Sequence, residues 1–144
     1  MKLKPEITIL KWSLFSGGIY FLLISVAHLI SLKIPGLYIY FSVPSYDYQD
    51  KIISFMSFGW GIFFLQAAHE PIKSLKLVRA ILIAGTGAIV GLIIINLSRE
   101  FSVLIPETSV TIFWIETGLL ALYLIWLIYY YRKVYLLLNV QGES

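Results

Sequence analysis

The sequence predicts an all-α fold, in which residues 1–144 form a single integral membrane domain built as a four-helix transmembrane bundle. Hydrophobic residues make up 59% of the chain and charged residues only 13%, and the mean hydropathy is +0.85. A soluble domain carries about 25% charged residues, so this chain has too little polar surface to cover a soluble globule. Four apolar stretches also approach the length of about 20 residues that a helix needs to cross the hydrocarbon core.

The four predicted spans follow one another with short polar connections between most of them. They cover residues 12–32, 52–69, 79–97 and 110–131. The first stretch is longer than the apolar region of a signal peptide and no small-x-small cleavage site follows it, so we expect a retained span. A backbone in lipid must satisfy its own hydrogen bonds, and apolar runs of this length do so as helices.

The distribution of basic residues predicts that both termini are cytoplasmic. Lysine and arginine are enriched in the cytoplasmic loops of membrane proteins. The first connection therefore faces the outside, and we expect the chain to lie in a bacterial inner (plasma) membrane. One side of the predicted bundle holds Lys2, Lys4, Lys11, Lys73, Lys76, Arg79, Arg132 and Lys133, and the other holds Lys33, Lys51 and Arg99.

Several function classes have no support in the sequence. The chain contains no cysteine, which excludes disulfides, zinc–thiolate sites, iron–sulfur clusters and cysteine nucleophiles. The motifs of nucleotide-binding loops, zinc metalloproteases and serine hydrolases are absent. Basic residues are scattered beside apolar runs, so nucleic acid is not an expected partner. We predict no catalytic residue and no metal site.

Two ionisable residues inside the predicted spans lie at matching depth. His28 is about five residues from the outer end of the first span, and Glu116 is about six residues into the fourth. At about 1.5 Å of rise per residue, both lie roughly 7–9 Å below the outer surface. They would form either a proton-handling or ligand-holding pair, or polar contacts that fix helix packing. The packing interpretation is favoured, because a lone pair is weak evidence for chemistry.

Further polar residues gather at the same outer rim and define a candidate polar pocket. Ionisable groups in a span usually face the bundle interior or a water-filled cavity. A solvated membrane interface, where lysine and arginine side chains extend to water, is the alternative interpretation. The pocket residues are His28, Asp47, Asp50, Lys51, Asn96, Arg99 and Glu116.

Small residues predict where helices pack closely. In the second span, Asp50, Ser54, Ser57 and Gly61 recur at spacings that place them on one helical face. This face either lets a neighbouring helix approach or lines a water-accessible funnel. In the third span, Gly87 and Gly91 form a GxxxG pattern, which we interpret as a packing site.

No cofactor is predicted from the residues. His28 lies near the outer end of the first span and His69 near the inner end of the second. The two histidines differ in depth by most of the bilayer, so a haem ligated by both is not expected.

The layout resembles the DoxX-like group of small four-helix membrane proteins over roughly residues 12–131. The resemblance rests on Gly59-Trp60-Gly61 in the second span, Arg99 after the third, and Glu116 within WIETG in the fourth. It implies a four-helix membrane fold and a link to quinone-dependent oxidation of reduced sulfur, although most members of the group have no assigned activity. His28 and the long, tyrosine-rich outer loop depart from the pattern.

Three functions stay open. By elimination, we favour a non-enzymatic accessory protein or subunit of a membrane complex, which docks to a membrane-protein partner or a second copy through its small-residue faces. One alternative is a quinone- or small-molecule-linked redox component with a site at the outer rim. The other is a small transporter, which would need to oligomerise because four helices offer little room for a pathway.

Overall fold

The computed structural model describes residues 5–38, 40–98 and 110–142. In this part of the chain the helices are α1 (Pro5–Leu29), α2 (Asp47–His69), α3 (Leu75–Leu97) and α5 (Thr111–Gly142). Each of the four is long and apolar enough to cross a membrane. The structure is thus that of an integral membrane protein with four candidate spans, as the composition predicts.

The first and last helices extend beyond the predicted spans. Helix α1 begins at Pro5 rather than residue 12, because proline is well tolerated in the first turn of a helix. Helix α5 continues to Gly142 rather than ending near residue 131, since no proline interrupts it. Its 32 residues would measure about 48 Å, well beyond the hydrocarbon thickness of about 30 Å. Arg132 follows the first residue of α5 by about 32 Å, so basic residues begin where the hydrocarbon ends.

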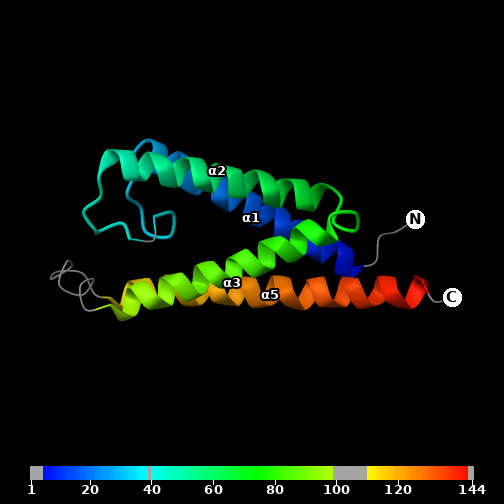
Figure 1. Ribbon diagram of the computed structural model, residues 1–144. Helices are drawn as coiled ribbons and strands as arrows, with labels where there is room; N and C mark the ends of the chain where they lie inside the picture. Colours follow the sequence, from blue (N-terminus) through cyan, green and yellow to red (C-terminus); the bar gives the residue numbers. More distant parts are fainter. Residues whose placement is uncertain (1–4, 39, 99–109, 143–144) are drawn as a thin grey trace.

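The helices form two antiparallel pairs. Helix α1 packs most extensively on α2, and α3 packs on α5, while smaller contacts join α1 to α5 and α2 to α3. Figure 1 shows that the two pairs meet near both chain termini and diverge toward the opposite end. We call these the closed end and the open end. The long connection, residues 30–46, extends at the open end from the α1–α2 pair toward α3 and α5.

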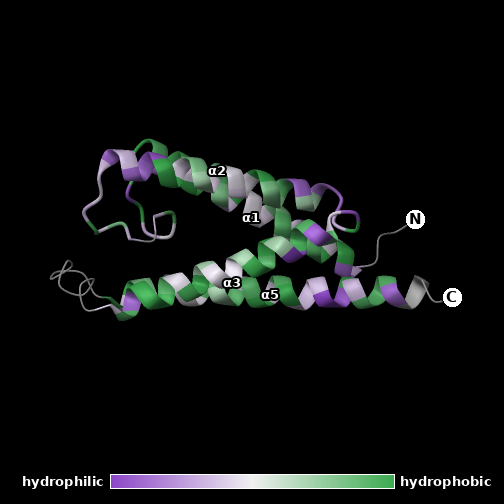
Figure 2. Ribbon diagram, in the orientation of Figure 1, coloured by the Kyte–Doolittle hydropathy of each residue, from purple (hydrophilic) through white to green (hydrophobic). Residues whose placement is uncertain are grey.

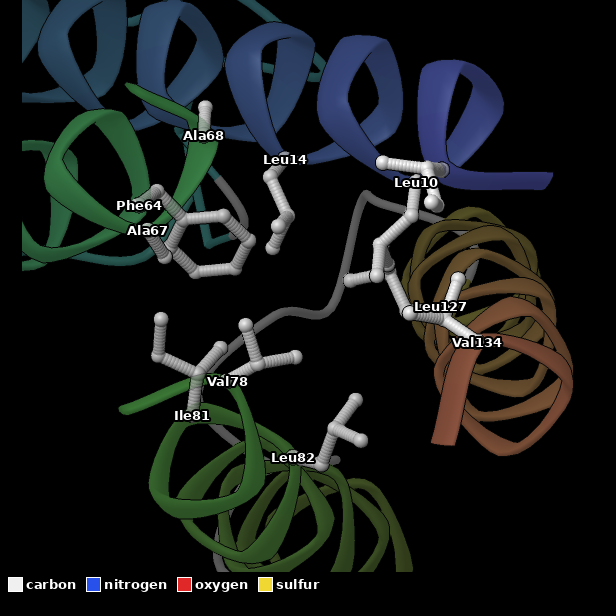
Figure 3. Close-up of a cluster of buried hydrophobic side chains, with 11 residues drawn as sticks. Leu10, Leu14, Phe64, Ala67, Ala68, Val78, Ile81, Leu82, Leu127 and Val134 are labelled. Atoms are coloured by element: carbon white, nitrogen blue, oxygen red, sulfur yellow. The ribbon is translucent and has the colours of Figure 1, made fainter. Parts of the chain in front are cut away.

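A hydrophobic core holds the closed end together. Figure 3 shows side chains from all four helices converging there. Leu10 and Leu14 of α1 face Phe64 of α2, Val78 of α3 and Leu127 of α5. All five are buried, so the packing of this end fixes how the two pairs meet. A smaller cluster at the open end joins the long connection to α5 around Phe113.

Polar residues lie mainly toward the ends of the helices, and apolar residues dominate their middle parts (Figure 2). Hydrophilic positions colour the beginning of α2 at the open end and the link between α2 and α3 at the closed end. An apolar band between two polar ends is the distribution that a bilayer requires.

The predicted small-residue face of α2 lies against α1. Ser54, Ser57 and Gly61 are buried there. A Cβ atom at Gly61 would lie 2.8 Å from Leu22 Cδ2 and 3.2 Å from the carbonyl oxygen of Gly18. Glycine at this crossing therefore lets the two backbones approach closely.

The GxxxG pattern of α3 makes no such contact within the described chain. A Cβ atom at Gly87 or Gly91 would have no atom within 4 Å, leaving out its sequence neighbours and the local backbone. Helix α3 instead approaches α5 near Gly85, where a Cβ would lie 3.1 Å from Leu124. Gly87 and Gly91 therefore do not pack on another helix within the described chain, because α3 turns a different face toward α5, and docking of a further helix there stays a prediction.

Candidate functional site

A buried imidazole and a buried carboxylate face each other at the open end. His28 lies in the last turn of α1 and Asp50 in the first turn of α2, and both are at least 95% buried. His28 Nδ1 lies 3.6 Å from Asp50 Oδ1, an ion pair when the imidazole is protonated. The antiparallel packing of α1 on α2 brings the end of one helix to the beginning of the other and so creates this pair.

The long connection completes the environment of the Asp50 carboxylate. The Tyr38 hydroxyl donates a hydrogen bond to Asp50 Oδ1, and the Ser45 hydroxyl donates one to Oδ2 at 3.0 Å. The Tyr38 ring also stacks on His28, with ring centroids 3.7 Å apart and planes 17° from parallel. Tyr38 thus covers the imidazole and holds the carboxylate at the same time.

One turn deeper, a second polar contact joins the same two helices. Ser25 Oγ and Ser54 Oγ lie 3.2 Å apart, and both side chains are buried. Ser25 precedes His28 by three residues and Ser54 follows Asp50 by four, so each serine shares a helical face with an ionisable partner. We call His28, Asp50, Tyr38, Ser25 and Ser54 the polar cluster.

The polar cluster borders a cavity of about 610 Å³, which we call the His28 cavity. Its walls come from α1, α2, the long connection and Leu92 of α3. They are mostly apolar, with a few polar groups, as in most small-molecule sites. The lining residues include Phe21, Ile24, His28, Tyr38, Tyr40, Ser45, Gln49, Asp50, Ile53 and Ser57.

Glu116 belongs to a different site. Its Oε1 accepts a hydrogen bond from the Gly36 backbone N–H at 2.9 Å, and the Tyr20 hydroxyl donates to the Gly36 carbonyl oxygen at 2.6 Å. Gly36 has a φ of +83°, in the left-handed region that favours glycine. These contacts lie at one end of a groove of about 400 Å³ between α1 and α5. We call it the Glu116 groove.

The structure therefore separates His28 from the carboxylate with which the sequence analysis paired it. His28 faces Asp50, and Glu116 bonds the backbone of the long connection. Depth alone suggested the pair, but depth does not specify which way a side chain points around its helix. The candidate polar pocket is thus divided into two sites, and the proposed His28–Glu116 contact is replaced by the His28–Asp50 contact.

The other predicted pocket residues have separate places. Asp47 and Lys51 form an exposed i,i+4 ion pair at the beginning of α2, with 2.6 Å between Lys51 Nζ and Asp47 Oδ2. Asn96 is buried between α3 and α5, where its Nδ2 donates to Thr117 Oγ1 at 3.0 Å. Asn96 Oδ1 also accepts a hydrogen bond from the Tyr40 hydroxyl at 3.1 Å. Arg99 lies outside the described residues.

Two tyrosines of the long connection hold their protons more tightly than usual. Burial, and secondly the hydrogen bond to Asp50, raise the pKa of the Tyr38 hydroxyl. Burial, and secondly the negative charge of Glu116, raise the pKa of Tyr40 to about 12. Both hydroxyls therefore remain neutral hydrogen-bond donors at any physiological pH, so the contacts that they make to Asp50 and Asn96 persist.

Several residues of these sites were missed by the sequence analysis. Tyr38 entered the sequence analysis only as part of the tyrosine-rich outer loop, but it is buried against His28. Ser25 is three residues before His28, and this spacing places the two side chains on one face of α1. Gly18 is seven residues before Ser25, which places it on the same face as Ser25. Ser45 carries no sequence signal, because irregular backbone decides where it lies, whereas the Pro35-Gly36 dipeptide is typical of a turn and so marks Gly36.

The side chains of these sites can bind and position a molecule and can exchange a proton. Within the described ranges, no group of three or more histidine, cysteine or acidic side chains is placed to hold a metal ion. His69 ends α2 at the closed end, whereas His28 ends α1 at the open end, so no single haem can be ligated by both. No family model, curated protein or solved structure matches the chain.

Proposed function

We propose that this chain is a small multi-pass membrane protein that binds a membrane-soluble small molecule in the His28 cavity. The cavity volume of about 610 Å³ falls within the range of about 300–1,000 Å³ that is common for ligand sites. Its apolar side chains, such as Phe21, Ile24 and Ile53, suit the body of such a molecule. The polar groups of His28, Gln49 and Ser57 suit a hydrogen-bonding head.

One observation carries this proposal. His28 and Asp50 are buried together beside the cavity, and ionisable groups within a span are costly unless they serve packing or function. The Asp50 oxygens are occupied by Tyr38 and Ser45, whereas His28 Nδ1 has no hydrogen-bond partner in the described part of the chain. The imidazole is therefore the group that is available to a ligand or a proton.

The positive-inside rule predicts on which side of the membrane the His28 cavity lies. Counting the basic residues of the connections assigns the closed end to the cytoplasm and the open end to the extracytoplasmic face. In a bacterial inner membrane, the His28 cavity would then receive its ligand from the outer leaflet or from the space outside it.

The test is to identify what the protein retains from its native membrane. The wild type, His28→Ala and Asp50→Asn are extracted in lipid particles, and the bound small molecules are compared by mass spectrometry. A compound that fills the cavity is retained by the wild type and falls about tenfold or more in both variants, since His28→Ala removes the imidazole and Asp50→Asn removes the carboxylate charge that faces it.

Asp47→Asn is the matched control, because it makes the same change one turn away on the exposed side of α2. If wild type, variants and control retain the same molecules in the same amounts, the proposal is wrong. A retained quinone would favour the redox component that the DoxX-like resemblance implies.

A second candidate, an accessory subunit of a membrane complex, is favoured by one face of α3. Ala84, Gly87 and Ala88 are exposed on it, and Gly87 and Gly91 have open space where a Cβ would lie. Small residues of this kind let another transmembrane helix approach closely. Gly87→Ile and Gly91→Ile should abolish cross-linking to such a partner without changing the protein's own melting temperature; unchanged cross-linking would remove this candidate.

A further inference from the structure

We propose that the Glu116 groove binds a phospholipid with a primary ammonium head group, and that the Glu116 carboxylate accepts hydrogen bonds from this head group. The groove lies between α1 and α5 and is separate from the His28 cavity. The inference therefore does not depend on the function proposed for that cavity.

Among the described residues, only one of the two oxygens of the Glu116 carboxylate has a hydrogen-bond partner. Its Oε1 accepts a hydrogen bond from Gly36 N, and Gly36 is itself held by the Tyr20 hydroxyl. Its Oε2 is buried and has no hydrogen-bond partner among the residues that the structure describes. A buried acceptor without a donor costs free energy, so a donor supplied from outside the chain would be bound favourably.

The neighbouring polar groups are not available to supply that donor. The Tyr123 hydroxyl donates to the Ser13 carbonyl oxygen at 2.7 Å, and the Ser16 hydroxyl donates to the same oxygen at 2.9 Å. The Tyr20 hydroxyl is committed to Gly36. Of the ion pairs formed by the described residues, none includes Glu116. A cationic donor is thus the complementary ligand.

The rest of the groove suits an acyl chain. From Glu116 it follows α5 past Leu119 and Leu120 to Tyr123, with Gly17 on the facing side of α1. These positions of α5 extend over about 10 Å. Leu119 is 61% exposed, so the rim of the groove opens toward the surrounding lipid. A bilayer lipid can enter sideways and place its chain along these leucines.

The depth of Glu116 agrees with a lipid head group. Glu116 is five residues beyond the first residue of α5, or about 7.5 Å along the helix axis. A primary ammonium group donates hydrogen bonds, whereas the quaternary ammonium of a choline head group has no N–H to donate. The unpartnered Oε2 therefore predicts discrimination between ethanolamine and choline lipids of otherwise identical structure.

The experiment is native mass spectrometry of the detergent-solubilised protein. Phosphatidylethanolamine and phosphatidylcholine with the same acyl chains are added at equal concentration, and the ratio of the two lipid adducts is measured. We expect the wild type to prefer phosphatidylethanolamine by about tenfold, as one charge-assisted hydrogen bond allows. Glu116→Gln, which keeps an acceptor for Gly36 N, should reduce the ratio to about one.

Two more variants make the result decisive. Glu70→Gln removes an exposed carboxylate that is paired with Lys73 at the closed end, and it should keep the wild-type ratio. Leu119→Trp fills the rim of the groove and keeps the Glu116 carboxylate, and it should lower the phosphatidylethanolamine adduct severalfold. This second variant also decides the matter if Glu116→Gln does not fold.

The same spectra contain the outcomes that overturn the inference. Equal binding of both lipids by the wild type would mean that Glu116 Oε2 does not accept a hydrogen bond from the head group. A preference that survives both Glu116→Gln and Leu119→Trp would place the lipid elsewhere on the protein. A dimer that disappears in Glu116→Gln would assign the groove to a second copy of the chain. His28→Ala should retain the lipid preference, so failure at the His28 cavity is distinguishable from failure here.

Discussion

At the scale of single residues, the two aspartates at the beginning of α2 show how position decides the role of a charge. Asp47 is exposed and paired with Lys51, whereas Asp50 is buried and accepts hydrogen bonds from Tyr38 and Ser45. They are only three residues apart on α2, but Tyr38 and Ser45 of the long connection cover Asp50, whereas Asp47 stays exposed. Asp50 is thus also a structural group, because it fastens the long connection to the helix pair.

We expect Asp50→Asn to destabilise the protein by about 1–3 kcal/mol, because an asparagine has one carbonyl oxygen for the two hydroxyl donors of Tyr38 and Ser45. Asp47→Asn should cost less than about 1 kcal/mol, since exposed ion pairs contribute little. Unfolding of both variants in the same detergent micelles measures the difference. Equal effects of the two substitutions would mean that Asp50 does not hold the long connection.

A second prediction at this scale concerns Tyr40. Its pKa is raised to about 12 from an ordinary value of 10.0, by burial first and by the charge of Glu116 second. Below pH 10 its contribution to stability is complete, and as the pH rises from 10 to 12 that contribution is lost. The Tyr40→Phe variant should therefore lose less stability than the wild type as the pH rises from 10 to 12.

Ultraviolet difference titration of wild type against Tyr40→Phe measures this directly. The difference should show one tyrosine that ionises near pH 12, and Glu116→Gln should shift it to lower pH. If the tyrosine that is lost in Tyr40→Phe ionised at its ordinary pH in the wild type, the partial burial of Tyr40 beside Asn96 would be contradicted.

At the scale of helices, the sequence predicted the number of spans better than their contacts. The spans come from hydropathy and length, which depend on each segment alone. Which helices pack together depends on side chains that look equally apolar in the sequence. Gly61 and Gly91 both lie in small-residue patterns, yet only Gly61 meets a facing backbone. For the same reason, His28 and Glu116 matched in depth but not in direction.

The glycines give a prediction at the scale of helix packing. Gly61→Ala should destabilise the protein by about 1–3 kcal/mol, because a Cβ would press on α1 and overpacking has a cost of this order. Gly18→Ala should behave alike, since its Cβ would lie 2.7 Å from Leu65 Cδ2. Gly87→Ala should be neutral or stabilising, because alanine is the better helix former. The melting temperatures of the three variants in one detergent measure this. A lower melting temperature for Gly87→Ala than for Gly61→Ala and Gly18→Ala would contradict the prediction.

At the scale of the whole molecule, the closed end and the open end differ in how closely the four helices pack. The closed end carries a core to which all four helices contribute. At the open end the helix pairs diverge, and the long connection packs against the cluster around Phe113. Both candidate sites involve this connection, through Tyr38 at the His28 cavity and Gly36 at the Glu116 groove. A chain of 144 residues thereby combines a firmly packed half with a half that carries both candidate sites.

The side of the membrane that the open end faces determines which molecules reach these sites. The basic residues predict an extracytoplasmic open end, and the cysteine-free sequence makes the test direct. Tyr48→Cys introduces a thiol at an exposed position of the open end, and Lys73→Cys introduces one at an exposed position of the closed end. A membrane-impermeant maleimide should label Tyr48→Cys in intact cells and Lys73→Cys only after permeabilisation, while the wild type stays unlabelled. The opposite pattern would reverse the topology and make the His28 cavity a site for cytoplasmic ligands.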